Sequence, residues 1–213
     1  MSPALMMRKL RRVRLFALKL LSDRDGVAAI EFAMLLPIML VLFFGTVEFS
    51  AGVATNRKVS LMAQTLSDLT SRSISVSATD LSNFFAAGTG IMTPYVPPIY
   101  NQTNSTISEL WIDASGNARV QWSSGSSPRG QSTLVTIPTN LIVLDPTTHA
   151  VVPGQYLIFS EVQFVYQPVV DYMMSLTTPR FNWTTVSYTR PRQGACVIYP
   201  TPNSGPLPAC PTL

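Results

Sequence analysis

The feature that most constrains this chain is an apolar run of 21 residues, Val27 to Val47, in which Glu31 is the only charged residue. As an α-helix the run would be about 32 Å long, enough to cross a bilayer hydrocarbon core of about 30 Å. Pro37 is compatible with such a helix, because membrane helices tolerate a proline kink. The run therefore predicts a helix that crosses a membrane once.

The residues before the run are strongly basic. Residues 1–26 carry seven Lys or Arg and two Asp, a net charge of 7 − 2 = +5, whereas the rest carries eight basic and nine acidic residues, 8 − 9 = −1. Basic residues that flank an apolar helix stay on the cytoplasmic side. We therefore expect a cytoplasmic N-terminus and export of everything after about Ser50. No basic patch interleaved with aromatic residues follows, so we expect no nucleic-acid partner.

Apolar residues continue at helical spacing beyond the run. Val59, Met62, Leu66 and Leu69 follow one another at intervals of three, four and three residues, which places them on one helix face. The spacing predicts that the helix extends to about Ser71. Its apolar stripe would pack either on the chain's own downstream domain or on another copy of a similar helix.

Three interpretations fit Gly26, just before the apolar run, and Glu31, near its start. In the first, the segment is a plain membrane anchor, and Glu31 lies near the interface, where a charge costs little. In the second, it is a secretory signal peptide cut after Ala54, which leaves Thr55 as the N-terminus, although its apolar core is long for that class. In the third, it resembles a class III prepilin signal, cleaved between Gly26 and Val27.

The third interpretation gives each residue a chemical role. Glycine fits a tight membrane-peptidase site because it has no side chain. Cleavage would create an ammonium group at Val27 and would make Glu31 the fifth residue of the mature chain. Its carboxylate could then pair with the ammonium group of a neighbouring subunit, and in lipid such a pair costs far less than either charge alone. The pair would set the register of subunits in a helical filament.

Residues 22–72 resemble the TadE-like (TadE/TadG) proteins of tight-adherence (Flp, type IVc) pilus systems. The matching residues are Gly26, Ala28, Ala29, Glu31, Phe32, Leu36, Pro37, Gly45, Glu48 and Phe49, followed by "RKVSLMAQTLSDL". The later stretch "YTRPRQG", which ends at Gly194, is similar to the same family. Glu48, at the far bilayer edge, is interpreted first as an interface anchor and second as a subunit contact.

The resemblance implies a minor pilin or pseudopilin that a prepilin peptidase processes and that filament assembly requires. It would reside in the bacterial inner membrane, with its C-terminal domain in the periplasm or in the extracellular pilus. Its partners would be the membrane, the peptidase, other pilins and pseudopilins, and the inner-membrane assembly platform. Two alternatives stay open: an unprocessed single-pass assembly factor, and a tethered periplasmic ligand-binding domain.

The sequence of the exported part predicts an α+β domain. Residues 80–92 predict a short helix capped by Thr79 or Asp80. The stretches "STISELWID" and "ARVQWS" predict a hairpin that turns through Gly116 and Asn117. Further strands are expected at "TLVTIP", "GQYLIFSEVQFVYQPV" and "RFNWTTVSYTR", the last of them as an edge or final strand. The predicted fold is a long N-terminal transmembrane helix that continues outside the bilayer, then a short helix packed on an antiparallel sheet of about five strands.

The charge, hydropathy and strand patterns predict that the chain has four segments. They are a basic cytoplasmic leader (1–26), the membrane helix with its extension (27–72), the periplasmic domain (73–192) and a Pro-rich tail (193–213). Cys196 and Cys210 are the only cysteines, and in an oxidising compartment they would close a loop worth about 3 kcal/mol of chain entropy. We expect this disulfide to be the only tether of the tail.

Little in the sequence points to catalysis. His149 is the only histidine and lies in a loop bounded by proline and glycine, and the exported carboxylates are scattered singly. Metal sites need His, Cys or carboxylates at ligand spacing. We therefore expect no enzyme activity, no metal and no cofactor. Four aromatic residues are candidates for partner contacts, although aromatic residues in strands more often belong to the core; they are Tyr95, Tyr100, Trp111 and Trp122.

Overall fold

The computed structural model describes residues 25–94, 103–166, 181–199 and 210. Contacts within the chain divide it into two units, Met1–Phe49 and Ser50–Leu213. The limits predicted at residues 26, 72 and 192 concern topology relative to a membrane, and they stay predictions.

The long N-terminal helix, α2 (Asp25–Ser71), runs through 47 residues with Pro37 inside it. All residues from Gly26 to Val47 are exposed. Within the described residues α2 is the one helix long and apolar enough to cross a membrane. The predicted apolar helix and its continuation to about Ser71 are therefore confirmed.

The second helix, α3 (Ala78–Ile91), starts two residues before the predicted position. Its N-cap is Ser77, not Thr79 or Asp80: Asp80 N–H donates to Ser77 Oγ at 3.1 Å, and Ser77 N–H donates to Asp80 Oδ2 at 2.9 Å. This is a capping box, which requires a spacing of three residues between the two partners. The hydrogen bonds from the Ser77 hydroxyl and N–H lower the pKa of Asp80.

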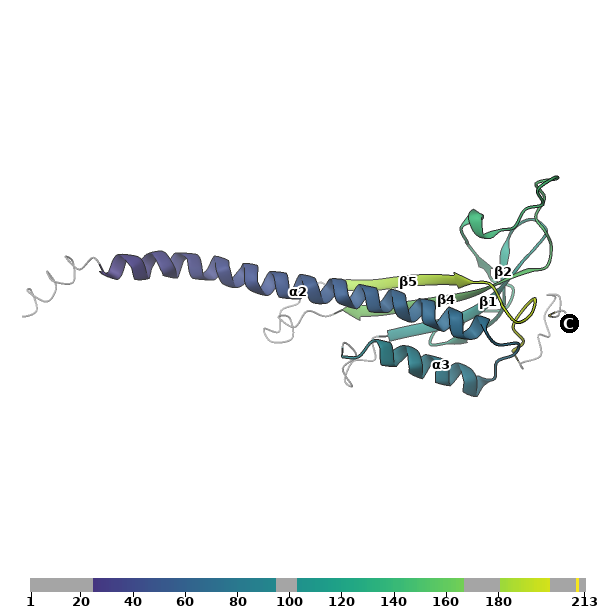
Figure 1. The fold of residues 1–213 in the computed structure, drawn as a ribbon, viewed down its shortest axis with the longest axis horizontal. Helices are drawn as coiled ribbons and strands as arrows, with labels where there is room; N and C mark the ends of the chain where they lie inside the picture. Colours follow the sequence, from purple (N-terminus) through teal and green to yellow (C-terminus); the bar gives the residue numbers. More distant parts are fainter. Residues whose placement is uncertain (1–24, 95–102, 167–180, 200–209, 211–213) are drawn as a thin grey trace, which may run out of the picture. The chain divides into compact units, whose positions relative to one another are not determined.

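Five antiparallel strands form one sheet in the order β3-β2-β1-β4-β5. Their bounds are β1 Thr103–Ile112, β2 Ala118–Gly125, β3 Leu134–Val135, β4 Gln155–Tyr166 and β5 Phe181–Thr189. The predicted α+β fold is confirmed, and β5 lies at an edge as expected (Figure 1). The predicted hairpin through Gly116 and Asn117 joins β1 to β2.

The strand β3 is shorter than "TLVTIP" predicted. Only Leu134 and Val135 pair with β2. Pro138, which has no N–H to donate to a ladder, begins the 3₁₀ turn η1 (Thr139–Leu141). The chain between β3 and β4 therefore leaves the sheet edge as a long loop.

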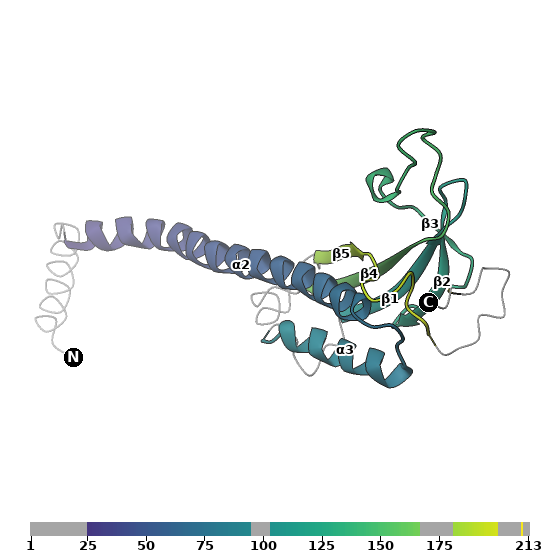
Figure 2. The same ribbon diagram turned by 45° about the vertical axis from the view of Figure 1, so that its right-hand side comes forward.

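The sheet is covered on both faces. One core cluster joins α2 and α3 to β1, β2 and β4, and includes Val59, Met62 and Leu66, which are fully buried. The apolar stripe of α2 therefore packs on the chain's own domain, whereas Leu69 is only half-buried. The second cluster joins β1, β2 and β4 to the loop between β3 and β4. Figure 2 shows α2 and α3 on one side of the sheet and this loop beyond its end.

Candidate functional site

The predicted cleavage junction lies in the first turn of α2, which begins at Asp25. Gly26 and Val27 are exposed, and a side chain built on Gly26 would meet no atom within 4 Å. Among the described residues, nothing therefore covers the junction.

Glu31 lies four residues after Val27, which places both on the same helix face, one turn apart. Glu31 and its neighbour Phe32 are both exposed. A carboxylate in this place is accessible to an ammonium group from another subunit. The pairing of Glu31 with a neighbouring subunit stays a prediction.

Three further residues predicted to matter, Gly45, Glu48 and Phe49, lie at the C-terminal end of the first unit. A side chain on Gly45 would meet no atom within 4 Å, and Phe49 is exposed. Glu48 is half-buried. It lies 17 residues after Glu31, about 25 Å along a helix, so the two carboxylates belong to different sites.

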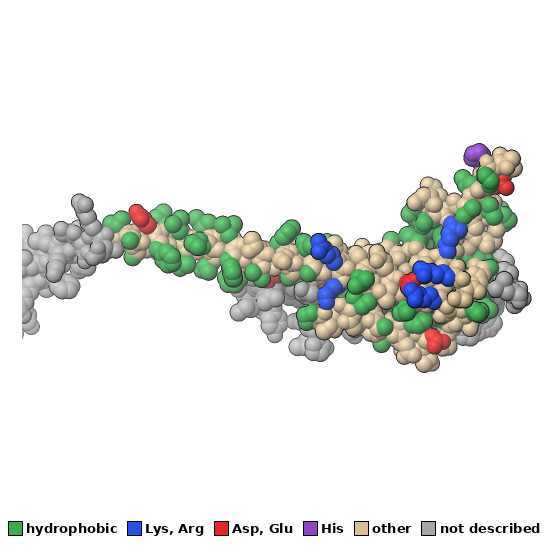
Figure 3. All heavy atoms as spheres, in the orientation of Figure 1, with side chains coloured by type: hydrophobic (Ala, Val, Ile, Leu, Met, Phe, Trp, Pro, Cys, Tyr) green, Lys and Arg blue, Asp and Glu red, His purple; other side chains and the backbone are tan. Residues whose placement is uncertain are grey.

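The surface of α2 in the first unit is apolar. Fifteen large hydrophobic residues are exposed: Val27, Ile30, Phe32, Met34, Leu35, Leu36, Ile38, Met39, Leu40, Val41, Leu42, Phe43, Phe44, Val47 and Phe49. Figure 3 shows hydrophobic side chains over the visible face of this segment, with an acidic one near its start. A helix that is apolar all round requires lipid or other helices as its surroundings.

Glu109, on β1, is a buried carboxylate that the sequence did not reveal. Its Oε2 accepts a hydrogen bond of 2.8 Å from Trp122 Nε1, and its Oε1 accepts one of 2.6 Å from the N–H of Val197. Burial raises the pKa of Glu109 to about 8, although both hydrogen bonds oppose this shift. Because β1 is buried on both faces, alternation along the strand gave no signal for this position.

The C-terminal segment is held by more than the predicted disulfide. Ile198 pairs with Ser75 in a parallel bridge, and Tyr199 stacks on Trp122 with ring centroids 5.2 Å apart. The expectation of a single tether is therefore wrong for the described residues, because Glu109 and the linker between α2 and α3 supply hydrogen-bond partners. Cys196 is joined to Cys210 by a disulfide, with Cα atoms 5.9 Å apart.

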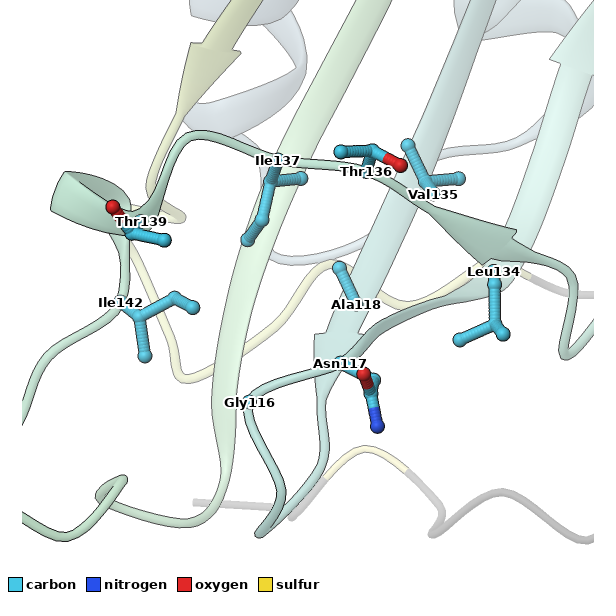
Figure 4. A pocket seen from close by; sticks show the side chains of 9 residues that line it. All are labelled: Gly116, Asn117, Ala118, Leu134, Val135, Thr136, Ile137, Thr139 and Ile142. Atoms are coloured by element: carbon cyan, nitrogen blue, oxygen red, sulfur yellow. The ribbon is translucent and has the colours of Figure 1, made fainter.

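A pocket of about 250 Å³ lies between the β1–β2 turn and the loop after β3 (Figure 4), and its lining contains no ionisable side chain. Its lining residues are Gly116, Asn117, Ala118, Leu134, Val135, Thr136, Ile137, Thr139 and Ile142. In the described residues no group of three or more His, Cys, Asp or Glu could hold a metal ion.

The single histidine and the aromatic residues fall in different surroundings. His149 is exposed in the loop between β3 and β4. Trp122 is buried in the core and Trp111 is half-buried. Tyr95 and Tyr100 lie outside the described residues.

Comparison with known protein families finds one match, and it lies in α2. Residues 26–66 match the model of the TadE-like protein family. No curated protein and no solved structure matches the chain. The matched segment begins at Gly26 and ends inside α2, so the resemblance to TadE-like proteins is confirmed for this segment.

Proposed function

From the TadE-like segment in α2, we propose that this chain is a minor pilin or pseudopilin of a tight-adherence pilus, and that it packs into the assembly through α2. One observation carries the proposal. The segment that matches the family coincides with a helix whose first part is apolar and exposed. Neighbouring subunit helices and lipid are the surroundings that such a surface requires.

A prepilin peptidase is proposed to cleave between Gly26 and Val27. The match to the family starts at Gly26, and the junction is exposed in the first helical turn. After cleavage the Val27 ammonium group and the Glu31 carboxylate would lie one turn apart at the start of the mature helix. Glu31 would then pair with the ammonium group of a neighbouring subunit and so fix the register of assembly.

The proposed topology places the N-terminus in the cytoplasm, α2 in the inner membrane and the sheet domain in the periplasm. The net charge of +5 on residues 1–26 supports this orientation. The disulfide between Cys196 and Cys210 fits an oxidising compartment. The inner-membrane assembly platform and the other pilins would be the partners of the membrane-embedded part.

The N-terminus of the membrane-extracted protein tests this function first. Intact mass or terminal sequencing is expected to find a chain that starts at Val27. A chain that starts at Met1 would instead indicate an unprocessed anchored assembly factor. A start at Thr55 would indicate a secreted domain, but Thr55 is fully buried inside α2, so that cut would remove helix from the folded unit.

A matched pair of glycine variants separates recognition of the junction from general damage to the helix. Gly26→Val is expected to leave the full-length chain, because the bulky side chain would occupy the peptidase site. Gly45→Val adds the same atoms at another helix position with no neighbouring atom within 4 Å, so processing should continue. If Gly26→Val is processed like wild type, cleavage does not depend on this glycine.

A further inference from the structure

The chain around Cys196 is an extended segment that packs into the second unit. Cys196 is 2% exposed and Val197 is fully buried, and Val197 belongs to the core cluster that joins α2 and α3 to the sheet. We call residues 196–199 the C-terminal latch. The latch follows β5, and its residues take no part in the ladders that pair the strands of the sheet.

Side chains of the sheet hold the backbone of Val197. Its N–H donates to Glu109 Oε1 at 2.6 Å, and its carbonyl oxygen accepts a hydrogen bond of 2.9 Å from Trp122 Nε1. The same Trp122 N–H also donates to Glu109 Oε2 at 2.8 Å. Buried backbone groups require hydrogen-bond partners, and here two side chains supply what a neighbouring strand supplies in a sheet.

The linker between α2 and α3 binds the next residue of the latch. The N–H of Ile198 donates to the carbonyl oxygen of Ile74 at 3.0 Å, and the N–H of Val76 donates to the carbonyl oxygen of Ile198 at 2.9 Å. Tyr199 stacks on Trp122. The latch therefore lies between this linker and two side chains of the sheet.

The chain just before the latch has an anchor of its own. The N–H of Arg192 donates to the carbonyl oxygen of Ser71 at 2.8 Å, and Arg192 Nη2 lies 2.7 Å from Asp68 Oδ1. These contacts involve no latch residue, so they remain when the latch leaves its place. Opening of the latch costs its own hydrogen bonds and the burial of Val197, but no ladder of the sheet. Segments near a chain end with few such contacts open at lower free energy than core strands.

Burial protects the disulfide between Cys196 and Cys210 unequally. Cys196 is 2% exposed, whereas Cys210 is partly exposed. A thiolate breaks a disulfide by attack on one sulfur, and the other sulfur leaves as a thiolate. Attack on Cys196 is blocked by its burial. Attack on Cys210 would displace a Cys196 thiolate that is cut off from water, and such a thiolate is a poor leaving group.

We propose that the C-terminal latch controls thiol–disulfide exchange at Cys196 and Cys210: the disulfide reacts with a dithiol only when the latch is open, and the latch opens while the sheet stays folded. In this reaction the dithiol loses two hydrogen atoms and becomes a disulfide, and the two cysteines each gain one as thiols. The proposal concerns the second unit alone. It holds whether or not Gly26 is the processing site, so it and the proposed function fail independently.

The first test measures how fast excess dithiothreitol reduces the disulfide in the full chain in detergent micelles. Alkylation of the thiols and intact mass give the rate. Trp122→Phe removes the N–H that reaches Val197 and Glu109 and keeps an aromatic ring for the stack with Tyr199. We expect it to raise the rate of reduction about ten-fold, the size of effect that loss of a buried hydrogen bond has on an opening equilibrium.

Trp183→Phe is the matched control, because it makes the same change beside the same core cluster. Trp183 pairs with Phe164 of β4, whereas Glu109 pairs with Ile158 of the same strand. The two places are 164 − 158 = 6 residues apart, about 20 Å along β4. Trp183→Phe should therefore leave the rate of reduction unchanged.

Hydrogen exchange of the wild-type protein tests local opening without any variant. In the oxidised protein, the N–H groups of Val197 and Ile198 should exchange faster than those of β1 and β4. Reduction removes the link to Cys210, so exchange in the latch should become faster still, while exchange in β1 and β4 stays as it was. This pattern is expected only if the latch opens apart from the sheet.

Three results would overturn the proposal. The first is exchange of Val197 and Ile198 no faster than exchange in β4, which would mean that the latch opens only when the sheet unfolds. The second is an equal rate of reduction in Trp122→Phe and Trp183→Phe. The third is reduction of the folded wild-type protein as fast as that of the urea-unfolded chain, which would mean that the closed latch does not protect the disulfide.

Discussion

Glu109 is mostly protonated at neutral pH, because burial raises the pKa of its carboxyl group to about 8. In the unfolded chain the same group has a pKa near 4.5. At pH values between about 4.5 and about 8, the carboxyl group of Glu109 has lost its proton in the unfolded chain but keeps it in the folded chain. The contribution of this residue to stability is therefore complete below about pH 4.5 and is lost as the pH rises towards 8.

We expect the free energy of unfolding of the sheet domain to fall between pH 5 and pH 8, with a slope of at most about 1.4 kcal/mol per pH unit from this group. Urea midpoints at several pH values would measure it. Glu109→Gln should flatten the slope, because the amide does not titrate. Asp145→Asn is the control: backbone hydrogen bonds from Thr148 and Thr147 lower the pKa of Asp145, so its contribution changes only in acid. An unchanged slope in Glu109→Gln would contradict the assignment.

Replacement of Glu31 tests whether its carboxylate pairs with the ammonium group of Val27 in a neighbouring subunit. Glu31→Gln keeps the size of the side chain and removes the charge that would pair with the Val27 ammonium group. If the proposed function holds, filament assembly should be lost while the protein still accumulates in the membrane. Electron microscopy of sheared filaments and blotting of the membrane fraction measure the two outcomes. Normal filaments would show that Glu31 is an ordinary interfacial acid, as expected for a plain anchor.

At the scale of elements, the packing of α3 on α2 depends on one glycine. A Cβ at Gly88 would lie 3.0 Å from Met62 Cε and 3.2 Å from Leu66 Cδ2, tighter than ordinary van der Waals contact. The absence of a side chain therefore allows α3 to approach the buried face of α2. The sequence signal for this contact was weak, because glycine inside a helix has several possible causes.

Gly88→Val should destabilise the sheet domain by about 1–3 kcal/mol, the usual cost of overpacking a core. Gly90→Val makes the same change two residues later in α3, where a Cβ would meet no atom within 4 Å, and should be close to neutral. Chemical denaturation of both variants measures the difference. Equal effects would mean that helix propensity, and not the contact with Met62, decides the result.

At the scale of the whole molecule, the second unit contains the residues of both core clusters. Val59, Met62 and Leu66 supply a fully buried face to it from α2. A fragment of residues 50–213 should therefore fold without the membrane segment. A fragment of residues 73–213 should aggregate, because the helix that covers one face of the sheet is missing.

Circular dichroism and size-exclusion chromatography of the two fragments measure this difference. A folded, monodisperse 73–213 fragment would contradict the role given to α2 in the core. The same 50–213 fragment also tests the tethered-domain alternative, since small-molecule binding that it retains alone would count against the pilin proposal.

The sequence by itself determined the long apolar helix, its continuation to about Ser71, the α+β class and the resemblance of residues 26–66 to TadE-like proteins. These features depend on local periodicity, on net charge along the chain and on a motif within one helix, and all three can be read without knowledge of distant contacts. The stripe of Val59, Met62 and Leu66 predicted a buried face, but two partners for that face stayed open.

Only the tertiary structure decided that this face packs on the chain's own sheet, that Glu109 holds the C-terminal segment, and that Arg192 and Arg72 share Asp68 near the end of α2. The physical reason is sequence separation. Glu109 and Val197 are 88 residues apart, and Asp68 and Arg192 more than a hundred, so neither spacing nor composition connects them. Such contacts arise where strands and segments distant in the chain are brought to one face of the sheet.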